Sequence, residues 1–166
     1  MNDISVIRPN TSHAGAIGEI CTIGWRQTVA GKLSEEYKQK NIEFWYTPNR
    51  VASDIEKGQY SYVALIDSEV VGVIGGAMTG EQVGEIFVLY VDENCRYKGI
   101  GKKLLQALTD EQMERGVREQ WVSVQEDNQL GIPFYESRGF IYQKKRITVT
   151  DTEENQVSLR YMRKLS

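Results

Sequence analysis

The chain is poor in the residues that build metal centres and disulfide frameworks. Its 166 residues include one histidine, His13, and two cysteines, Cys21 and Cys95. One histidine and two distant cysteines do not supply the ligand set of a zinc site. Two cysteines also give no disulfide framework, which is typical of proteins in a reducing compartment. The sequence therefore predicts no metal cofactor.

Long apolar segments and an excess of positive charge are missing as well. No run reaches the roughly 18 apolar residues that indicate a membrane span, and residues 1–4 lack a basic and then apolar targeting signal. We therefore expect a cytoplasmic protein that makes no membrane contact. The formal net charge of −3 argues against a nucleic-acid-binding surface. The length suits one domain over residues 1–166.

The most informative segment runs from Val91 to Leu105. It follows an apolar, β-rich stretch and leads into an amphipathic helix, so Gly99 and Gly101 fall where a turn becomes a helix. The first amides of a helix have no intrahelical partner, and the helix dipole adds positive charge there, so this end favours an anion such as phosphate. Glycines let a bulky diphosphate approach the main chain. Nearby positive charge comes from Lys98, Lys102 and Lys103.

Two common phosphate-binding motifs do not fit this turn. A dinucleotide-binding fingerprint needs a third glycine where the chain has Leu104. A Walker A loop would begin at Arg96 instead of glycine and would have Lys103 in place of serine or threonine. The spacing that fits is [QR]-x-x-G-x-[GA], present as Arg96-Tyr97-Lys98-Gly99-Ile100-Gly101.

This turn resembles the pyrophosphate-binding motif of the GNAT superfamily of N-acetyltransferases, which use acetyl-coenzyme A. A second segment strengthens the resemblance: a β-rich stretch at 119–125, then Asn128, Phe134-Tyr135 and Gly139-Phe140. The resemblance covers roughly residues 60–145. It implies an α/β (α+β) fold with a mixed, mostly antiparallel sheet of about seven strands flanked by helices. A splayed strand pair would hold the cofactor.

Local patterns predict the individual elements. Thr11 or Ser12 is expected to cap the first helix, and Thr47 with Pro48 to start the third. The predicted helices begin near residue 12, span 34–45, run from 47 to Gly58, and cover 99–115 and 128–138. The predicted strands cover 4–8, 60–66, 70–78, 83–91, 119–125, 140–149 and 157–165, the last two forming a hairpin.

Glu85 is the candidate general base. It lies eleven residues before Arg96, and the histone-acetyltransferase branch of the resembling superfamily has its general-base glutamate at the same offset. A carboxylate can take a proton from an attacking amine directly or through a water molecule. Side chains alternate along a strand, so without a bulge Glu85 would share a face with Phe87, Leu89 and Val91. A solvated residue at a strand end is the alternative interpretation of Glu85, and Glu81 is a weaker candidate base.

Tyr135 matches the position of the superfamily's general-acid tyrosine, which lies near the sulfur of the leaving thiolate. The alternative is a core aromatic, a role that the sequence assigns more naturally to Phe134. Asn128 is expected to cap the following helix, and the resemblance also gives it a contact with the pantetheine arm. Together the resemblance places these residues at the cofactor: Leu89, Tyr90, Val91, Arg96, Tyr97, Lys98, Gly99, Ile100, Gly101, Lys102, Asn128 and Tyr135.

The sequence therefore predicts transfer of an acetyl group from acetyl-coenzyme A directly to a primary amine of a small molecule or a peptide N-terminus. Trp25 or Trp45 is a candidate acceptor contact, and the resemblance favours a homodimer. The alternative function is a non-catalytic coenzyme A sensor of the same fold. A nucleotide-binding switch is disfavoured because both nucleotide motifs fail on spacing.

Overall fold

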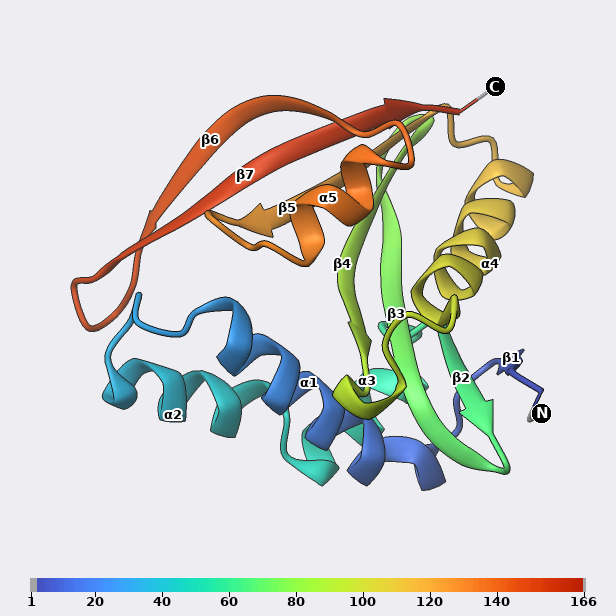
Figure 1. Cartoon of the computed structure of the whole chain (residues 1–166), viewed down its shortest axis with the longest axis horizontal. Coiled ribbons are helices and arrows are strands. Elements are labelled where there is room, and N and C mark those ends of the chain that lie inside the picture. The colour runs from blue at the N-terminus through green and yellow to red at the C-terminus, as the bar shows by residue number, and fades with distance from the viewer. Residues whose placement is uncertain (1–2, 166) are drawn as a thin grey trace.

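Residues 3–165, which the computed structural model describes, form one mixed sheet of seven strands with helices on both faces (Figure 1). The strand order is β1-β2-β3-β4-β5-β7-β6. The strands are β1 (Ser5–Ile7), β2 (Tyr62–Ile66), β3 (Glu69–Gly80), β4 (Val83–Val91), β5 (Glu119–Gln125), β6 (Ile141–Val149) and β7 (Asn155–Lys164). The helices are α1 (Ala14–Thr28), α2 (Glu35–Trp45), α3 (Pro48–Glu56), α4 (Ile100–Glu114) and α5 (Gly131–Glu136), with 3₁₀ turns η1 (Thr11–His13) and η2 (Glu93–Cys95).

Neighbouring strands pair antiparallel at every junction of the described sheet except β4–β5, which is parallel. Tight turns join β2, β3 and β4 into an antiparallel meander. A parallel pair needs a crossover, and α4 supplies it between β4 and β5. The predicted fold class is therefore confirmed.

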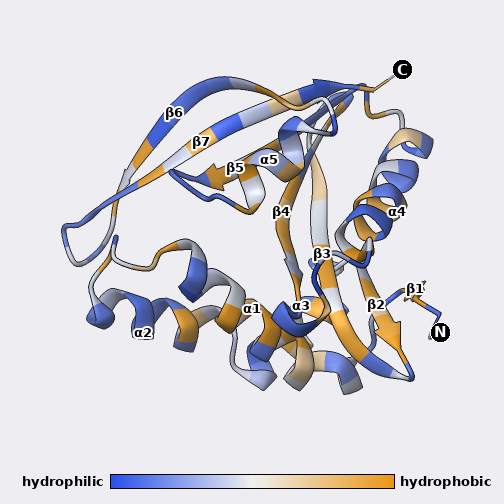
Figure 2. Ribbon diagram, viewed as in Figure 1, coloured by the Kyte–Doolittle hydropathy of each residue, from blue (hydrophilic) through white to orange (hydrophobic). Residues whose placement is uncertain are grey.

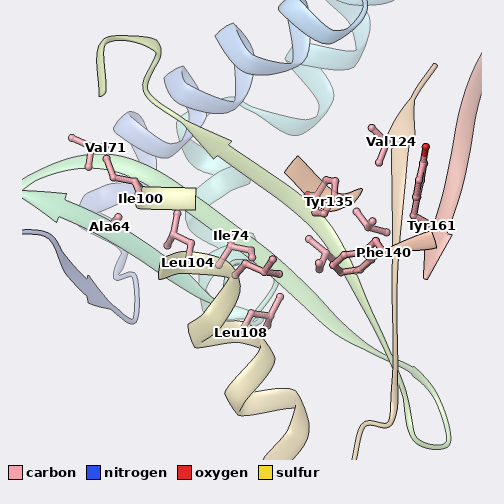
Figure 3. Packing of buried hydrophobic residues seen from close by; sticks show 13 residues of the cluster. Ala64, Val71, Ile74, Ile100, Leu104, Leu108, Val124, Tyr135, Phe140 and Tyr161 are labelled. Carbon is pink, nitrogen blue, oxygen red and sulfur yellow. The ribbon is translucent and has the colours of Figure 1, made fainter. Parts of the chain in front are cut away.

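Two apolar layers hold the helices to the sheet. On one face, Ile17 and Cys21 of α1 and Val51 of α3 pack with Val63 and Val73 of the sheet. On the other face, the packed side chains include Ile74, Ile86, Ile100, Leu104, Leu108 and Val122 (Figure 3). Burying each large aliphatic side chain stabilises the fold by roughly 1.5–3 kcal/mol. Figure 2 shows hydrophobic residues gathered in β2, β3 and β4, whereas β6 is mostly hydrophilic.

Several helix ends follow their predicted signals. The Ser34 side chain accepts a hydrogen bond from the Tyr37 amide at the start of α2. Pro48 occupies the first turn of α3, whose end is followed by Gly58 at φ +78°. After α4 comes Gly116 at φ +87°, a backbone conformation that glycine adopts without strain.

The start of the first helix differs from the prediction. The cap is Asn10 instead of Thr11 or Ser12, and it begins the 3₁₀ turn η1 before α1. The Asn10 side chain accepts a hydrogen bond from the Ser12 amide, and His13 Nδ1 accepts one from the Asn10 amide at 3.1 Å. This reciprocal arrangement is a capping box. His13 therefore has a structural role at the start of the helix.

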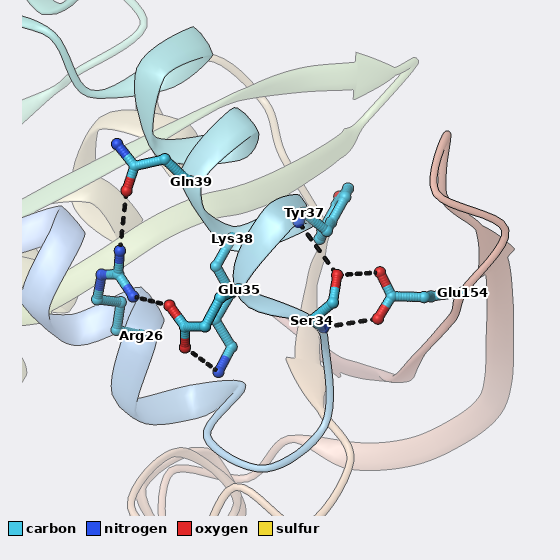
Figure 4. Close-up of polar contacts among 7 residues, drawn as sticks. All are labelled: Arg26, Ser34, Glu35, Tyr37, Lys38, Gln39 and Glu154. Carbon is cyan, nitrogen blue, oxygen red and sulfur yellow. Dashed lines mark hydrogen bonds and ion pairs between the residues drawn. The ribbon is translucent and has the colours of Figure 1, made fainter.

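The β6–β7 hairpin reaches across to the start of α2 (Figures 1 and 4). The Ser34 amide donates to Glu154 Oε1 at 2.6 Å, and the Ser34 hydroxyl donates to Glu154 Oε2 at 2.7 Å. Tyr37 adds a hydrogen bond from its hydroxyl to Gln156 at 3.3 Å. A carboxylate at a helix N-terminus is favoured by the free amides and by the helix dipole. We call the Ser34–Glu154 contact the hairpin latch.

Glu154→Gln is expected to flatten the acid side of the stability profile. Hydrogen bonds from the Ser34 hydroxyl, the Thr152 hydroxyl and the Ser34 amide lower the pKa of Glu154 below its usual range. Such a carboxylate stabilises the fold above its unfolded pKa of about 4.3, and this contribution is lost as the pH falls through the lower folded value. Melting temperatures below about pH 4.3 should therefore fall more steeply for the unmodified protein than for Glu154→Gln.

Glu153→Gln is the matched control, because it removes the neighbouring carboxylate without touching the latch. The control should follow the unmodified protein across the whole pH range. Parallel melting curves for Glu154→Gln and the unmodified protein would show that the latch adds no stability.

Candidate active site

The turn before α4 leaves backbone donors free. Gly99 adopts a left-handed conformation (φ +80°) before the first helical residue, and the described part of the chain has no side-chain cap at this helix start. The first backbone bond into the helix runs from the Lys103 amide to the Gly99 carbonyl at 3.1 Å. The amides of Ile100, Gly101 and Lys102 are the helix's unpaired first donors. An anion is the natural partner for them.

Glycine occupies positions 99 and 101 of the turn for two different structural reasons. Gly99 is required by its positive φ, and a Cβ placed on it would meet no atom within 4 Å. Gly101 is favoured by close packing, because a Cβ on it would lie 3.3 Å from the Phe134 ring of α5. Tyr97 also has a positive φ, +66°, and is 91% exposed. The turn is therefore open toward solvent at Gly99 and closed against α5 at Gly101.

Charged residues around the turn have separate roles. Arg96 donates to the Gln27 side chain of α1, which in turn donates to Glu93 at 2.7 Å. This network ties the turn to α1. Lys98 and Lys102 are exposed. Cys95 packs against the core as a small filler residue.

Strands β4 and β5 separate where the cofactor was expected. Their pairing covers only Val83–Ile86 of β4 against Glu119–Val122 of β5. Beyond that point β4 stays paired with β3 up to Val91, and β5 stays paired with β7 up to Gln125. Figure 1 shows the two strands diverging. The β5-facing edge of β4 at Leu89, Tyr90 and Val91 therefore has no partner strand within residues 3–165.

A β-bulge changes the face of Glu85. Gly75 pairs with Val88 and Gly76 pairs with Ile86, so Phe87 is an extra residue in β4. The expectation held only for a strand without a bulge, so Glu85 does not share a face with Leu89 and Val91. Leu89 and Val91 pack on the α4 side with Ile86, whereas Val88 and Tyr90 pack on the α1 side. Glu85, which precedes Ile86, points to the α1 side.

Glu85 is held by an arginine that the sequence did not indicate. Arg160 Nη2 lies 2.9 Å from Glu85 Oε1, and the two side chains are only 9% and 15% exposed. Arg160 is in β7, two strands away from β4, so only the register of β5 brings the pair together. Because Glu85 is largely buried, the alternative of a solvated strand end is wrong. Glu81 lies in the exposed turn between β3 and β4.

Tyr135 is part of the core. It is 7% exposed and its ring packs edge-on against Phe134 and Phe140, with centroids 5.2 and 5.3 Å away (Figure 3). Burial raises the pKa of Tyr135, so its hydroxyl stays protonated at neutral pH. No residue in 3–165 accepts a hydrogen bond from that hydroxyl. The core role was predicted for Phe134, but Phe134 is less buried than Tyr135, and the Arg138 guanidinium lies 3.9 Å from the centroid of its ring.

Of the other predicted residues, some lie beside the candidate site and others pack within the fold. The Asn128 side chain accepts hydrogen bonds from the Leu130 and Gly131 amides at 3.1 and 2.8 Å, which confirms its capping role. Tyr90 packs its ring against α1, where a Cβ on Gly24 would lie 2.3 Å away. Trp25 is buried beside Tyr37. Trp45 is 41% exposed and packs against Phe44.

The family follows from comparison with known proteins. The model of the protein family described as "Acetyltransferase (GNAT) family" matches residues 19–140 of the chain. This range includes β4, the turn, α4, β5 and α5. The chain belongs to the GNAT family. The expected superfamily is thereby confirmed, and membership supports an acyltransferase that binds coenzyme A.

Individual GNAT relatives add detail. The chain is 28% identical over 127 residues to the spermidine N(1)-acetyltransferase of Thermoplasma acidophilum, covering 74% of this chain and 78% of that protein. It is 40% identical over 55 residues to the [ribosomal protein bS18]-alanine N-acetyltransferase of Escherichia coli, covering 33% of this chain and 37% of that protein. The PaiA N-acetyltransferase of Thermoplasma acidophilum, solved with coenzyme A, has the same fold with a TM-score of 0.78 at 24% identity, covering 98% of this chain and 99% of that chain.

The described part of this GNAT chain lacks a group of side chains that could hold a metal ion and a helix that could cross a membrane. Residues 3–165 contain no group of three histidine, cysteine, aspartate or glutamate side chains placed to hold a metal ion. Over the same residues, no helix combines the length and apolarity needed to cross a bilayer.

Gly76→Ala is expected to destabilise the bulge beside Glu85. A Cβ on Gly76 would lie 2.3 Å from the Glu85 carbonyl oxygen, a backbone atom that cannot move cheaply. The free energy of unfolding should fall by about 1–3 kcal/mol, as for other overpacked sites. Gly80→Ala is the control on the same strand, since its Cβ would meet Val83 at an ordinary 3.6 Å. Equal urea midpoints for both variants would contradict this account of the bulge.

Proposed function

We propose that this GNAT protein is an N-acetyltransferase that moves the acetyl group of acetyl-coenzyme A directly to a primary amine. One observation carries the proposal: the uncapped start of α4, the separation of β4 from β5 and the buried carboxylate of Glu85 all belong to one strand and its following turn. A diphosphate needs donors, an extended amide-bearing arm suits a free strand edge, and an attacking amine needs a base.

The residues of the turn fit the donor. The backbone from Arg96 to Gly101, with Lys102, would hold the diphosphate through its amides, and Lys98 and Lys102 would add positive charge. The free edge at Leu89, Tyr90 and Val91 would pair with the pantetheine arm, and Asn128 lies at the start of the neighbouring α5. The coenzyme A bound in the PaiA structure, whose fold matches this one, supports this assignment.

Three groups of the protein would serve the reaction. An alkylammonium has a pKa near 10, so the amine must lose a proton before it attacks, and Glu85 would accept that proton directly or through water. The amine nitrogen then forms a bond to the thioester carbon as the carbon–sulfur bond breaks. A main-chain amide of residues 89–91 would polarise the carbonyl. The hydroxyl of Tyr135 would donate to the departing thiolate.

The acceptor is proposed to be a primary amine of a small molecule or a peptide N-terminus. One relative is named for spermidine and another for the alanine of a ribosomal protein. Both names describe amine acceptors. We propose for this chain only the chemistry that they share, which is acetylation of an amine.

Release of free thiol from acetyl-coenzyme A tests the proposed function. A panel with a polyamine, an alanine-terminated peptide and a free amino acid should give turnover with at least one amine, and Glu85→Gln should lower kcat. Binding of coenzyme A without turnover on any amine would instead support the non-catalytic sensor.

Tyr135→Phe is expected to lower kcat about 100-fold or more, the range of a lost acid–base group, while the KM for acetyl-coenzyme A stays within about twofold. The substitution removes one hydroxyl that makes no bond to any residue of 3–165 and keeps the buried ring. Phe134→Leu is the control, because it changes the neighbouring ring without removing a proton donor. Equal kcat for Tyr135→Phe and the unmodified enzyme would remove the acid assignment.

A further inference from the structure

Arg160 is an unusually buried charge for a residue with no assigned role. Its side chain is 9% exposed and makes three specific contacts. Nη2 donates to Glu85 Oε1 at 2.9 Å, and Nη1 donates to Ser123 Oγ at 2.8 Å. The guanidinium also lies over the Trp121 ring, 5.0 Å from its centroid.

Strand register brings these four residues to one face of the sheet. Glu85 pairs with Trp121 across the parallel junction, and Ser123 pairs with Arg160 across β5–β7. Paired residues on adjacent strands share a face. The β4–β5 pairing ends at Ile86, one residue after Glu85. The Arg160–Glu85 pair therefore lies at the point where the two strands separate.

The geometry of the Arg160–Glu85 pair leaves one carboxylate oxygen of Glu85 free to accept a proton. Arg160 engages only Oε1 of Glu85, and no residue in the described chain donates to Oε2. Arginine–carboxylate pairs are frequently bidentate, with two parallel N–H···O hydrogen bonds. Here the second nitrogen, Nη1, is turned to Ser123 instead.

The arrangement also costs stability. Arg160 Nε is buried with no hydrogen-bond partner. A buried unpaired donor is unfavourable, and a buried ion pair is weak evidence of stabilisation, because desolvation offsets the attraction. An unpaired buried group calls for an explanation, and a catalytic role is one of them.

We propose that Arg160 is a positioning residue for the reaction, which fixes the Glu85 carboxylate through Oε1 so that Oε2 faces the incoming amine. This inference rests on the proposed function. A guanidinium donates hydrogen bonds and has no acceptor, so Arg160 orients the carboxylate without competing for the proton. When Oε2 takes the proton from the ammonium, Arg160 becomes an uncompensated buried cation. That state is unfavourable and promotes transfer of the proton onward to solvent.

A double-mutant cycle tests this role. Arg160→Met should lower kcat at least tenfold and leave the KM for acetyl-coenzyme A within about twofold. Arg160→Lys keeps a cation on a flexible stem and should restore part of the lost kcat. In the Glu85→Gln background, Arg160→Met should change kcat by less than about twofold, because the residue acts through the carboxylate.

Arg163→Met is the matched control. Arg163 lies on the same strand but on the opposite face, where it donates to Gln120, Thr109 and the Arg138 carbonyl. Arg163→Met removes an equally well-bonded arginine that does not contact Glu85. Any factor by which it lowers kcat should therefore be the same in the unmodified protein and in the Glu85→Gln background. If Arg160→Met does not fold, Arg160→Lys and Ser123→Ala replace it in the same double-mutant cycle with Glu85→Gln. Ser123 is exposed, and both substitutions are expected to have smaller effects on kcat.

The outcomes separate the two proposals. An active enzyme in which Arg160→Met has normal kcat, or in which the Arg160 and Glu85 effects multiply, overturns the positioning role and leaves the proposed function intact. Absence of turnover in the unmodified protein on every amine overturns both. A loss of kcat that vanishes in the Glu85→Gln background supports the positioning role.

Discussion

The candidate active site depends on the point at which β4 and β5 stop pairing. Over Val83–Ile86 the two strands share a ladder, and beyond it each keeps only its outer partner. The bulge at Phe87 falls at this point, and Gly76, which pairs with Ile86, allows the close approach of the Glu85 carbonyl. An unpaired strand edge is normally avoided because its amides and carbonyls are unsatisfied. Here it lies beside a helix N-terminus that also lacks a cap.

Charge is arranged around this opening from both faces of the sheet. On the α4 side, free amides and exposed lysines favour an anion. On the α1 side, the buried Arg160–Glu85 pair carries no net charge but presents one free carboxylate oxygen. The hairpin that contains β7 is fixed at its tip by the latch to α2 (Figure 4). The strand that carries Arg160 is therefore anchored along its ladder with β5 and at its far end.

Local features were predictable because they depend on short stretches of sequence. The glycine turn, α4 and most strands were placed correctly, since periodicity and capping residues act within a few positions. The face of Glu85 was not predictable, because one bulge residue reverses the alternation after it. Arg160 was missed because its contact with Glu85 requires the register of three strands. Tyr135 was identified by resemblance, but its burial depends on how α5 packs against β5, which the sequence pattern does not specify.

The central claim is that the turn from Arg96 to Gly101 holds a diphosphate beside the open strand edge. Titration calorimetry with coenzyme A and with pantetheine, which lacks the diphosphate, tests it most directly. We expect coenzyme A to bind at one site per chain and pantetheine to bind at least about tenfold more weakly, since the helix amides would have no anion to contact. A natively folded protein that gives no heat with coenzyme A, or binds both ligands equally, would contradict the account.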